Sequence, residues 1–195
     1  MLVFVFGISI SGSVMADGGV YGGIGFGSSS VDIESGALDD GSNISGESKD
    51  ETDTSLSFFI GYEVNDNLSV EGGYIDFGEA SVTGISDGTG SFWFEGPVEI
   101  KYETTAIFLD IIGKYEINNS LDLIGKAGFY HADVDADATD VWGTVSIDES
   151  NTGLLLGFGL SYGFTDKVSG RLDGQGSVMS VIIIQLVSRI LILLD

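Results

Sequence analysis

The chain has 195 residues, of which 30 are Asp or Glu and 7 are Lys or Arg, so its formal net charge is −23. This charge excludes binding to nucleic acid through phosphate contacts. The chain has no Cys and one His, which excludes a disulfide framework and argues against a zinc or iron–sulfur centre. Its mean hydropathy is nevertheless positive, so charged and apolar residues must be segregated along the sequence.

An apolar stretch at residues 2–10 opens the chain, and the small residues Val14 and Ala16 follow it. Small residues at this spacing are what a signal peptidase requires, so cleavage after Ala16 is predicted. Residues 1–16 are then a signal peptide and residues 17–195 the mature domain. No Lys or Arg precedes the apolar stretch, as one normally would in a signal peptide, and a buried N-terminal strand is the alternative.

A nine-residue pattern occurs three times, beginning at Tyr62, Tyr115 and Tyr162. Each copy places three polar turn-forming residues between alternating apolar residues, which is typical of a tight β-hairpin. The turns are predicted at residues 65–67, 118–120 and 165–167. Strands are predicted at residues 19–28, 54–64, 68–78, 103–117, 121–132, 151–164 and 168–174, and a last one within residues 181–194.

Long acidic segments without strong periodicity separate these hairpins, at residues 29–53, 79–102 and 133–150. Short turns that alternate with long loops are typical of outer-membrane barrels, whose turns face the periplasm and whose loops face the medium. We therefore predict an all-β fold, an eight-stranded antiparallel up-and-down transmembrane β-barrel. It should have short periplasmic turns and long acidic extracellular loops.

The two faces of the predicted strands differ in a way that favours lipid outside the barrel. In the strand at residues 103–117, Ile107, Leu109 and Ile111 share one face, and Asp110 lies on the other. In other strands the second face consists mostly of small residues, which suits a narrow lumen. The apolar face is therefore predicted to contact lipid.

Two groups of residues are candidate sites. Tyr62, Tyr115 and Tyr162 each lie three residues before a turn, so they are predicted to form an aromatic girdle at the membrane interface. Isolated charges on the inward faces must pair, because an unpaired charge in a narrow lumen is costly. We predict a salt-bridge network that plugs the lumen, with a gated ion path as the alternative. Its members are Glu71, Asp110, Lys114, Lys126 and Arg171.

Asp133, Asp135 and Asp137 resemble the start of a calcium loop. However, Ala138 and Thr144 stand where that loop needs Gly and Glu. A solvated acidic loop is therefore predicted, with a weak divalent-ion site as the alternative.

Two further features are weaker candidates. His131 is the one imidazole, and no nucleophile motif accompanies it. Residues 92–94, Phe-Trp-Phe, are predicted to form an exposed aromatic cluster that anchors at the membrane rim or contacts a partner. No catalytic residue, cofactor or metal site is predicted.

The hairpins at residues 61–73, 113–128 and 159–171 resemble those of the OmpA-like family of small outer-membrane β-barrels. The resemblance covers about residues 19–173. It implies a non-enzymatic protein of the Gram-negative cell outer membrane, exported through the periplasm, with a structural or surface-interaction role. A narrow ion or solute channel is one alternative, and a lipid A acyl hydrolase that uses His131 is the other.

The same resemblance implies the partners. They are outer-membrane lipid and lipopolysaccharide, the barrel-assembly machinery, and an extracellular partner reached through the acidic loops. A monomer is expected, without nucleic acid and without a cofactor.

Residues 177–195 depart from the family pattern. Outer-membrane barrels normally end on an alternating strand with a terminal aromatic residue. This segment is almost continuously apolar, has no aromatic residue and ends on Asp195. It is interpreted either as an atypical eighth strand or as an end produced by a shifted reading frame. The first interpretation predicts that residues 181–194 pair with residues 20–28 and 168–174.

Overall fold

The computed structural model describes residues 5–15, 19–31, 33 and 36–177. These residues form the strands β1 (Val5–Met15), β2 (Val20–Val31), β3 (Ile44–Asp50), β4 (Thr52–Asn65), β5 (Leu68–Ser86), β6 (Gly96–Asn118), β7 (Leu121–Asp140), β8 (Gly143–Thr165) and β9 (Val168–Ser177). Within the described part of the chain, no helix is long and apolar enough to cross a membrane.

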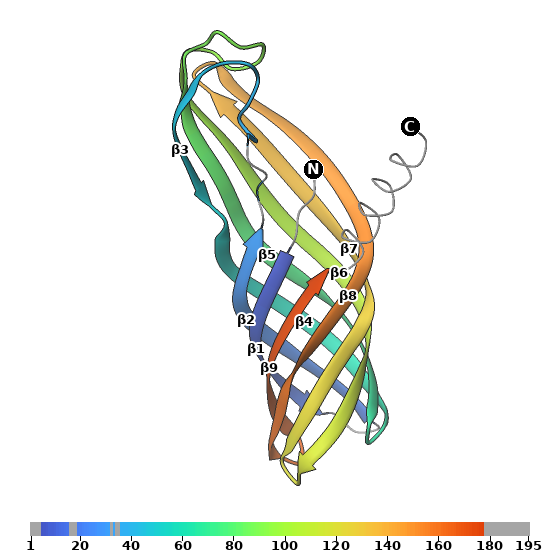
Figure 1. Cartoon of the computed structure of the whole chain (residues 1–195). Helices are drawn as coiled ribbons and strands as arrows, with labels where there is room; N and C mark the ends of the chain where they lie inside the picture. The colour runs from blue at the N-terminus through green and yellow to red at the C-terminus, as the bar shows by residue number, and fades with distance from the viewer. Residues whose placement is uncertain (1–4, 16–18, 32, 34–35, 178–195) are drawn as a thin grey trace, which may run out of the picture.

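Eight of these strands close into a ring (Figure 1). The order round the ring is β1, β2, β4, β5, β6, β7, β8 and β9, and β9 pairs again with β1. Every pairing is antiparallel, so the predicted eight-stranded up-and-down barrel is confirmed. A ring leaves no sheet edge open to lipid, where unpaired backbone N–H and C=O groups would be costly.

The strand that closes the ring differs from the predicted one. β1 pairs with β2 along its whole length and with β9 from Phe6 to Val14. It therefore fills the place expected of residues 181–194, which lie outside the described residues. Apolar residues alternate with Gly or Ser along most of β1, and this pattern suits a wall between lipid and a narrow lumen. Cleavage after Ala16 stays a prediction; in the uncleaved chain, the predicted signal peptide supplies a barrel strand.

The three predicted turns are confirmed, and the first polar residue of each one shapes it. The Asn65 side chain accepts a hydrogen bond from the backbone N–H of Asn67 at 2.9 Å. The Asn118 side chain accepts one from Leu121 at 3.2 Å, and the Thr165 hydroxyl accepts one from Val168. Such side chains imitate a backbone turn, which explains why these polar residues occur at the three equivalent positions. We call this end of the barrel the turn end.

An apolar band surrounds the barrel above the turn end. On β6, Ile107, Leu109 and Ile111 are all more than half exposed, which is the reverse of what water would favour for a soluble barrel. At about 3.4 Å per residue and a tilt near 40°, the stretch from Ile107 to Ile117 is roughly 25 Å high, as a membrane band requires. The predicted assignment of the apolar faces to lipid is therefore consistent with their exposure.

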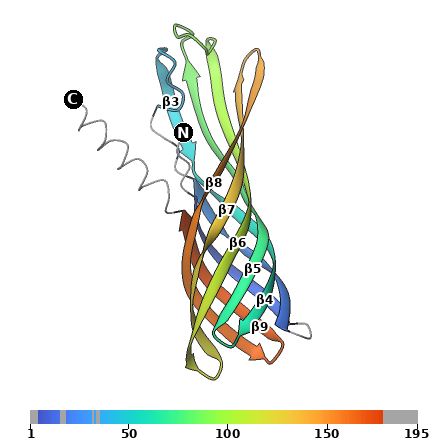
Figure 2. The same ribbon diagram turned by 90° about the vertical axis from the view of Figure 1, so that its right-hand side faces the viewer.

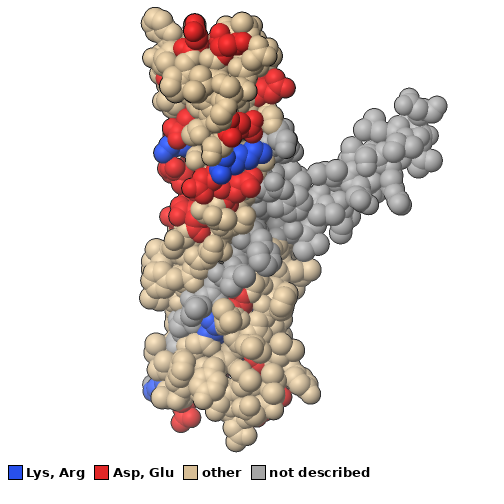
Figure 3. Space-filling view, turned by 60° about the vertical axis from the view of Figure 1, so that its left-hand side comes forward, with Lys and Arg blue, Asp and Glu red and all other residues tan. Residues whose placement is uncertain are grey.

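The acidic segments are not the long loops that were predicted. β5, β6, β7 and β8 continue far beyond the other strands (Figures 1 and 2). Their outer parts, residues 79–86, 96–103, 133–140 and 143–150, form one sheet with β3 at its edge. We call this sheet, with the segments that connect its strands, the extension. Most of the acidic side chains on the face shown in Figure 3 lie on it.

One face of the extension carries a hydrophobic core of its own. The core contains residues from β2 and the segment after it, from β5 and β6, and from the segment between these two strands: Val31, Ile33, Leu38, Ala80, Val82, Trp93, Val98 and Tyr102. Trp93 is buried and its indole N–H donates to the Leu38 carbonyl at 2.9 Å. The prediction that residues 92–94 are an exposed aromatic cluster is therefore wrong for Trp93, which points into this core. Phe92 and Phe94 are exposed as predicted.

Candidate functional site

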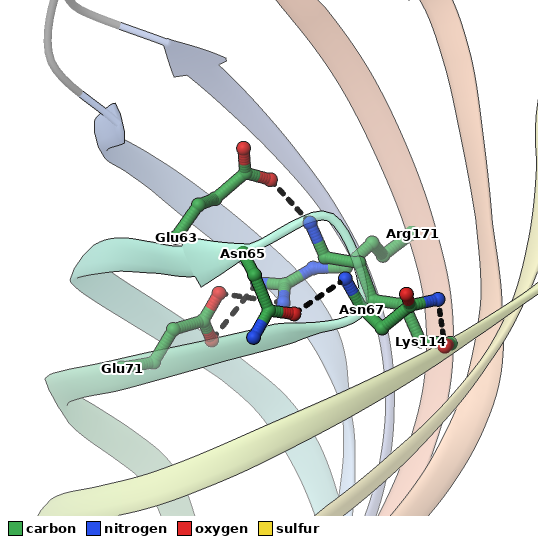
Figure 4. A network of polar contacts seen from close by, with 6 residues as sticks. All are labelled: Glu63, Asn65, Asn67, Glu71, Lys114 and Arg171. Atoms are coloured by element: carbon green, nitrogen blue, oxygen red, sulfur yellow. Dashed lines mark hydrogen bonds and ion pairs between the residues drawn. The ribbon is translucent and has the colours of Figure 1, made fainter.

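The lumen is crossed by a bidentate ion pair between Glu71 on β5 and Arg171 on β9 (Figure 4). The two guanidinium nitrogens Nη1 and Nη2 donate to the two carboxylate oxygens at 2.6 and 3.2 Å. Both side chains are buried, and the guanidinium also lies 4.5 Å above the ring of Phe59 on β4. A planar guanidinium matches a carboxylate and an aromatic face at once, which a lysine could not do.

Glycines opposite the charged side chains make room for them. Gly61 pairs with Glu71 across β4 and β5, and a Cβ there would come within 2.3 Å of the Tyr21 ring. Gly128 pairs with Asp110, and a Cβ there would come within 2.5 Å of that side chain. The lumen at this height is thus filled by a few large polar groups facing bare backbone.

A second ion pair lies in the same layer of the lumen. The Lys126 ammonium on β7 lies 2.5 Å from a carboxylate oxygen of Asp173 on β9, and both side chains are almost fully buried. Nearer the turn end, Lys114 on β6 pairs with Glu63 on β4 (Figure 4). Two of the three pairs therefore join β5 and β7 to β9 across the interior, and the third joins β6 to β4.

Asp110 is the exception among the inward charges. Its side chain is 1% exposed, and neither carboxylate oxygen has a hydrogen-bond partner. Its cross-strand neighbour is Glu71, another acid. In this part of the lumen, four carboxylates at residues 63, 71, 110 and 173 face three cations at residues 114, 126 and 171.

A cavity of about 40 Å³ lies between this layer and the turn end. Its walls are partly apolar and partly charged: Tyr21, Glu63, Ile112, Lys114, Ile124, Ser161, Ser169 and Arg171. A space of this size holds one or two water molecules.

The structure brings together some of the predicted lumen residues. Glu71 and Arg171 pair with each other, whereas Lys114 and Lys126 pair with Glu63 and Asp173, which were not among the candidates. Asp173 could have been found, because it stands two residues after Arg171 and so shares its face of β9.

The three candidate girdle tyrosines lie on the outer surface near the turn end. Tyr62, Tyr115 and Tyr162 are all exposed by about half or more. Tyr162 also makes an edge-to-face contact with the ring of Phe164, with the ring centroids 5.2 Å apart. Rings at this height can place their hydroxyls among lipid headgroups.

On the extension, the middle one of the three aspartates of β7 faces other acids. Asp135 pairs with Asp148 on β8 and with Glu103 on β6, while Asp133 and Asp137 flank it on the same face. Partial desolvation, together with the facing Asp148, raises the pKa of the Asp135 carboxyl. Within the described residues, no three His, Asp or Glu side chains are grouped in a way that could hold a metal ion.

Two other aspartates organise the connecting segments of the extension. The Asp40 carboxylate accepts hydrogen bonds from the backbone N–H groups of Phe92 and Trp93 at 2.7 and 2.8 Å. The hydrogen bond from the Ser42 hydroxyl, together with these two backbone bonds, holds the pKa of Asp40 well below its usual range. Hydrogen bonds from Thr89 and Asn43 likewise lower the pKa of Asp87 to about 2.

His131 lies on the exposed outer face where the apolar band meets the extension. Its Nδ1 is 2.8 Å from the Thr152 hydroxyl, and its Nε2 is 3.8 Å from an Asp133 oxygen. Its side chain is 45% exposed, and it does not line the cavity described above.

Solved structures of outer-membrane proteins resemble the chain at low sequence identity. Ail of Yersinia pestis, in complex with the heparin analogue sucrose octasulfate, is 17% identical, with 91% of this chain and 99% of Ail covered and a TM-score of 0.38. The N-terminal β-barrel of Pseudomonas aeruginosa OprF is 12% identical, with 89% and 96% covered and a TM-score of 0.40. A major outer membrane protein of Thermus thermophilus is 13% identical, with 88% and 98% covered and a TM-score of 0.39.

Comparison with curated proteins found no match. The model of a protein family, described as the OmpA-like transmembrane domain, matches residues 15–177. This match runs from the end of β1 to the end of β9 and includes all three repeated turns. The chain therefore belongs to the OmpA-like transmembrane domain family.

Proposed function

We propose that this protein is a structural barrel with a closed lumen that presents its acidic extension to the medium. Membership of the OmpA-like family establishes that the chain is a β-barrel of the bacterial outer membrane. The closed lumen is supported by one observation, a layer of two buried ion pairs, Glu71 with Arg171 and Lys126 with Asp173. We call these four residues the lumen layer.

The lumen layer opposes the passage of ions because its charges are already paired and both pairs are buried. To open a path, Arg171 would have to leave both the Glu71 carboxylate and the Phe59 ring. Removing the partner from a buried charge costs about 3–5 kcal/mol. Two such pairs at one height make a spontaneously open state rare.

A narrow channel is the second candidate, and two observations favour it. The cavity of about 40 Å³ already reaches Arg171 from the turn end. The buried carboxyl group of Asp110 has no hydrogen-bond partner among the described residues, so a small cation in the lumen could bind its oxygens.

Conductance across a planar bilayer separates the two candidates. The closed-lumen proposal expects no steady current from the purified, folded protein. Replacing both Glu71 and Arg171 by Ala should open the layer and produce a current. Glu116→Gln, an exposed change near the turn end, is the matched control and should stay silent. A steady current through the unmodified protein would refute the closed lumen and support the channel.

The proposed partners follow from the two surfaces. The apolar band is expected to contact outer-membrane lipid and lipopolysaccharide, after insertion by the barrel-assembly machinery. The extension is expected to meet any extracellular partner. We infer a non-enzymatic role for the monomer, since the exposed His131 has Thr152 and Asp133 beside it and does not line the cavity near the turn end.

A further inference from the structure

In the described part of the chain, the outer part of β8 is paired along one edge and open along the other. Residues 143–154 pair with β7 on one side. On the other side, β9 pairs with β8 from Leu155 toward the turn end, and β9 ends at Ser177. Within the described residues, no strand pairs with residues 143–154 on that side. The backbone N–H and C=O groups of an edge strand are a template for another strand.

The core face of this edge carries the apolar side chains of Val145 and Ile147, with Glu149 after them on the same face. Val145 and Ile147 pair with Ala138 and Ala136 of β7, which pack against the core of the extension. Val145 is 51% exposed and Ile147 is 56% exposed, although they lie on the face that the core covers elsewhere. The hydrophobic core of the extension therefore leaves the side chains of β8 at this edge uncovered, and one further strand would cover them.

The opposite face of this margin of the sheet is acidic, chiefly through the three aspartates of β7, to which β8 adds Asp148. Asp148 lies between Ser146 and Ser150 on β8, and Asp135 of β7 faces it directly. Across this face, the one lysine of β6 in the extension, Lys101, is already paired with Glu79 at 3.0 Å. Partial desolvation raises the pKa of Asp135, and the neighbouring charges of Asp148, Asp133 and Asp137 raise it further. A positive charge placed beside Asp148 would offset these negative charges.

We propose that the outer edge of β8, residues 143–152, binds an extended polypeptide in which basic residues alternate with apolar ones. The partner would add one strand to the extension sheet. Because side chains alternate between the faces of a strand, its apolar residues would cover Val145 and Ile147. Its basic residues would then lie beside Asp148 on the other face. This inference rests on the proposed surface role and names the partner class for it.

The alternation of basic and apolar residues distinguishes the proposed partner from other cationic molecules. Simple attraction to a chain of net charge −23 would favour every basic peptide, in any sequence order. Pairing with an edge whose two faces differ favours a strand with period two. The test therefore compares peptides of equal composition and charge.

Three synthetic ten-residue peptides are titrated into the folded full-length protein in detergent, with binding measured by fluorescence anisotropy. The first alternates Lys and Val, the second has the five Lys before the five Val, and the third alternates Glu and Val. We expect the first to bind at least tenfold more tightly than the second, and the third not to bind. Amide hydrogen exchange should slow within residues 143–152 when the first peptide is present.

Two variants with equal charge locate the site. Asp135→Asn combined with Asp148→Asn should weaken binding of the alternating peptide about tenfold or more. Asp122→Asn combined with Asp166→Asn removes the same charge at the turn end and should leave binding unchanged. Ile147→Lys should also weaken binding, because it puts a cation where the apolar residues of the partner must lie. Heat-dependent mobility on an SDS gel verifies that each variant is folded.

Other outcomes overturn the proposal in different ways. Equal binding of the alternating and block peptides would mean non-specific attraction to the acidic surface. Binding that appears after removal of residues 178–195 would mean that the tail of the chain occupies this edge. A dimer in solution with slow exchange at residues 143–152 would mean that a second copy occupies it. In each case the silent bilayer expected for the closed lumen is unaffected, so the two proposals fail separately.

Discussion

Glu71 and Arg171 lie 100 positions apart in the sequence, and their contact depends on the ring being closed with the right register. Alternation along each strand was sufficient to predict that both side chains point inward. It could not predict which inward charges meet, because the tilt and stagger of the strands decide that. The unpredicted partners Glu63 and Asp173 show the same limit, since each pairs with a residue on a strand distant in sequence.

Breaking the buried pair at one end should be strongly destabilising. Glu71→Gln leaves the Arg171 charge buried without its carboxylate, so the free energy of unfolding should fall by about 3 kcal/mol or more. Combining it with Arg171→Met removes the buried charge as well and should recover much of the loss. Urea unfolding in detergent measures both values. A double variant no more stable than the single one would contradict this account of the pair.

Asp135 gives the extension a dependence on pH. The raised pKa means that the folded state holds this proton more tightly than the unfolded state does. The resulting stabilisation is complete below about pH 4, the ordinary range of an Asp, and is lost as the pH rises through the raised pKa. The charged groups that face Asp135 are Asp148, Glu103, Asp133 and Asp137.

Asp135→Asn should therefore stabilise the extension at pH 7 and have no stabilising effect below about pH 4. Hydrogen exchange of the β7–β8 pair, compared between the variant and the unmodified protein, isolates this group from the other carboxylates. Equal exchange of the two proteins at pH 7 would show that the acids of this face do not repel one another.

At the scale of the strand, the sequence located the turn end well and the outer end poorly. Each turn is marked locally by Asn or Thr, and its side chain makes the hydrogen bond that shapes the turn. The outer half of β7 also alternates, with Val134, Ala136 and Ala138 between acids. Two of these three apolar residues are alanines, so the alternation is weak and the sequence predicts a loop there. The core that covers them, including Trp93, comes from other parts of the chain.

β1 closes the ring of strands, because it pairs with β2 on one side and with β9 on the other. Without it, β2 and β9 would each expose a strand edge to lipid, where every unsatisfied backbone group costs several kcal/mol. A chain that begins at Asp17 should therefore refold poorly in detergent and lack the heat-dependent shift on an SDS gel that the full chain shows. Equal refolding of the shorter chain would mean that another segment, such as residues 181–194, closes the ring.

For the molecule as a whole, charge and hydropathy are separated along the barrel axis. The acids of the extension lie at one end, and the apolar band lies between them and the turn end (Figure 3). Composition predicted this separation, because a chain of net charge −23 with positive mean hydropathy has no other arrangement in a membrane. It could not reveal that the acidic end is a folded sheet, since that depends on contacts among distant segments.

The orientation can be tested with protease on intact cells. We expect cleavage at the tips of the extension, in residues 87–95 and at residues 141–142, where strand pairing stops. The turns at residues 65–67, 118–120 and 165–167 should be cut after the cells are opened. Cleavage of these turns in intact cells, with the tips protected, would reverse the proposed orientation.

The pairing of β1 with β9 also fixes where the chain enters and leaves the barrel. Phe6 and Gly176 are cross-strand partners, and both lie at the end of the ring that carries the extension. A short linker could therefore join these two positions, and the chain could be reopened at a turn such as residues 118–120 to give a circular permutant with the same ring. With the extension facing the medium, a passenger peptide placed in that linker would be displayed on the cell surface beside the acidic sheet.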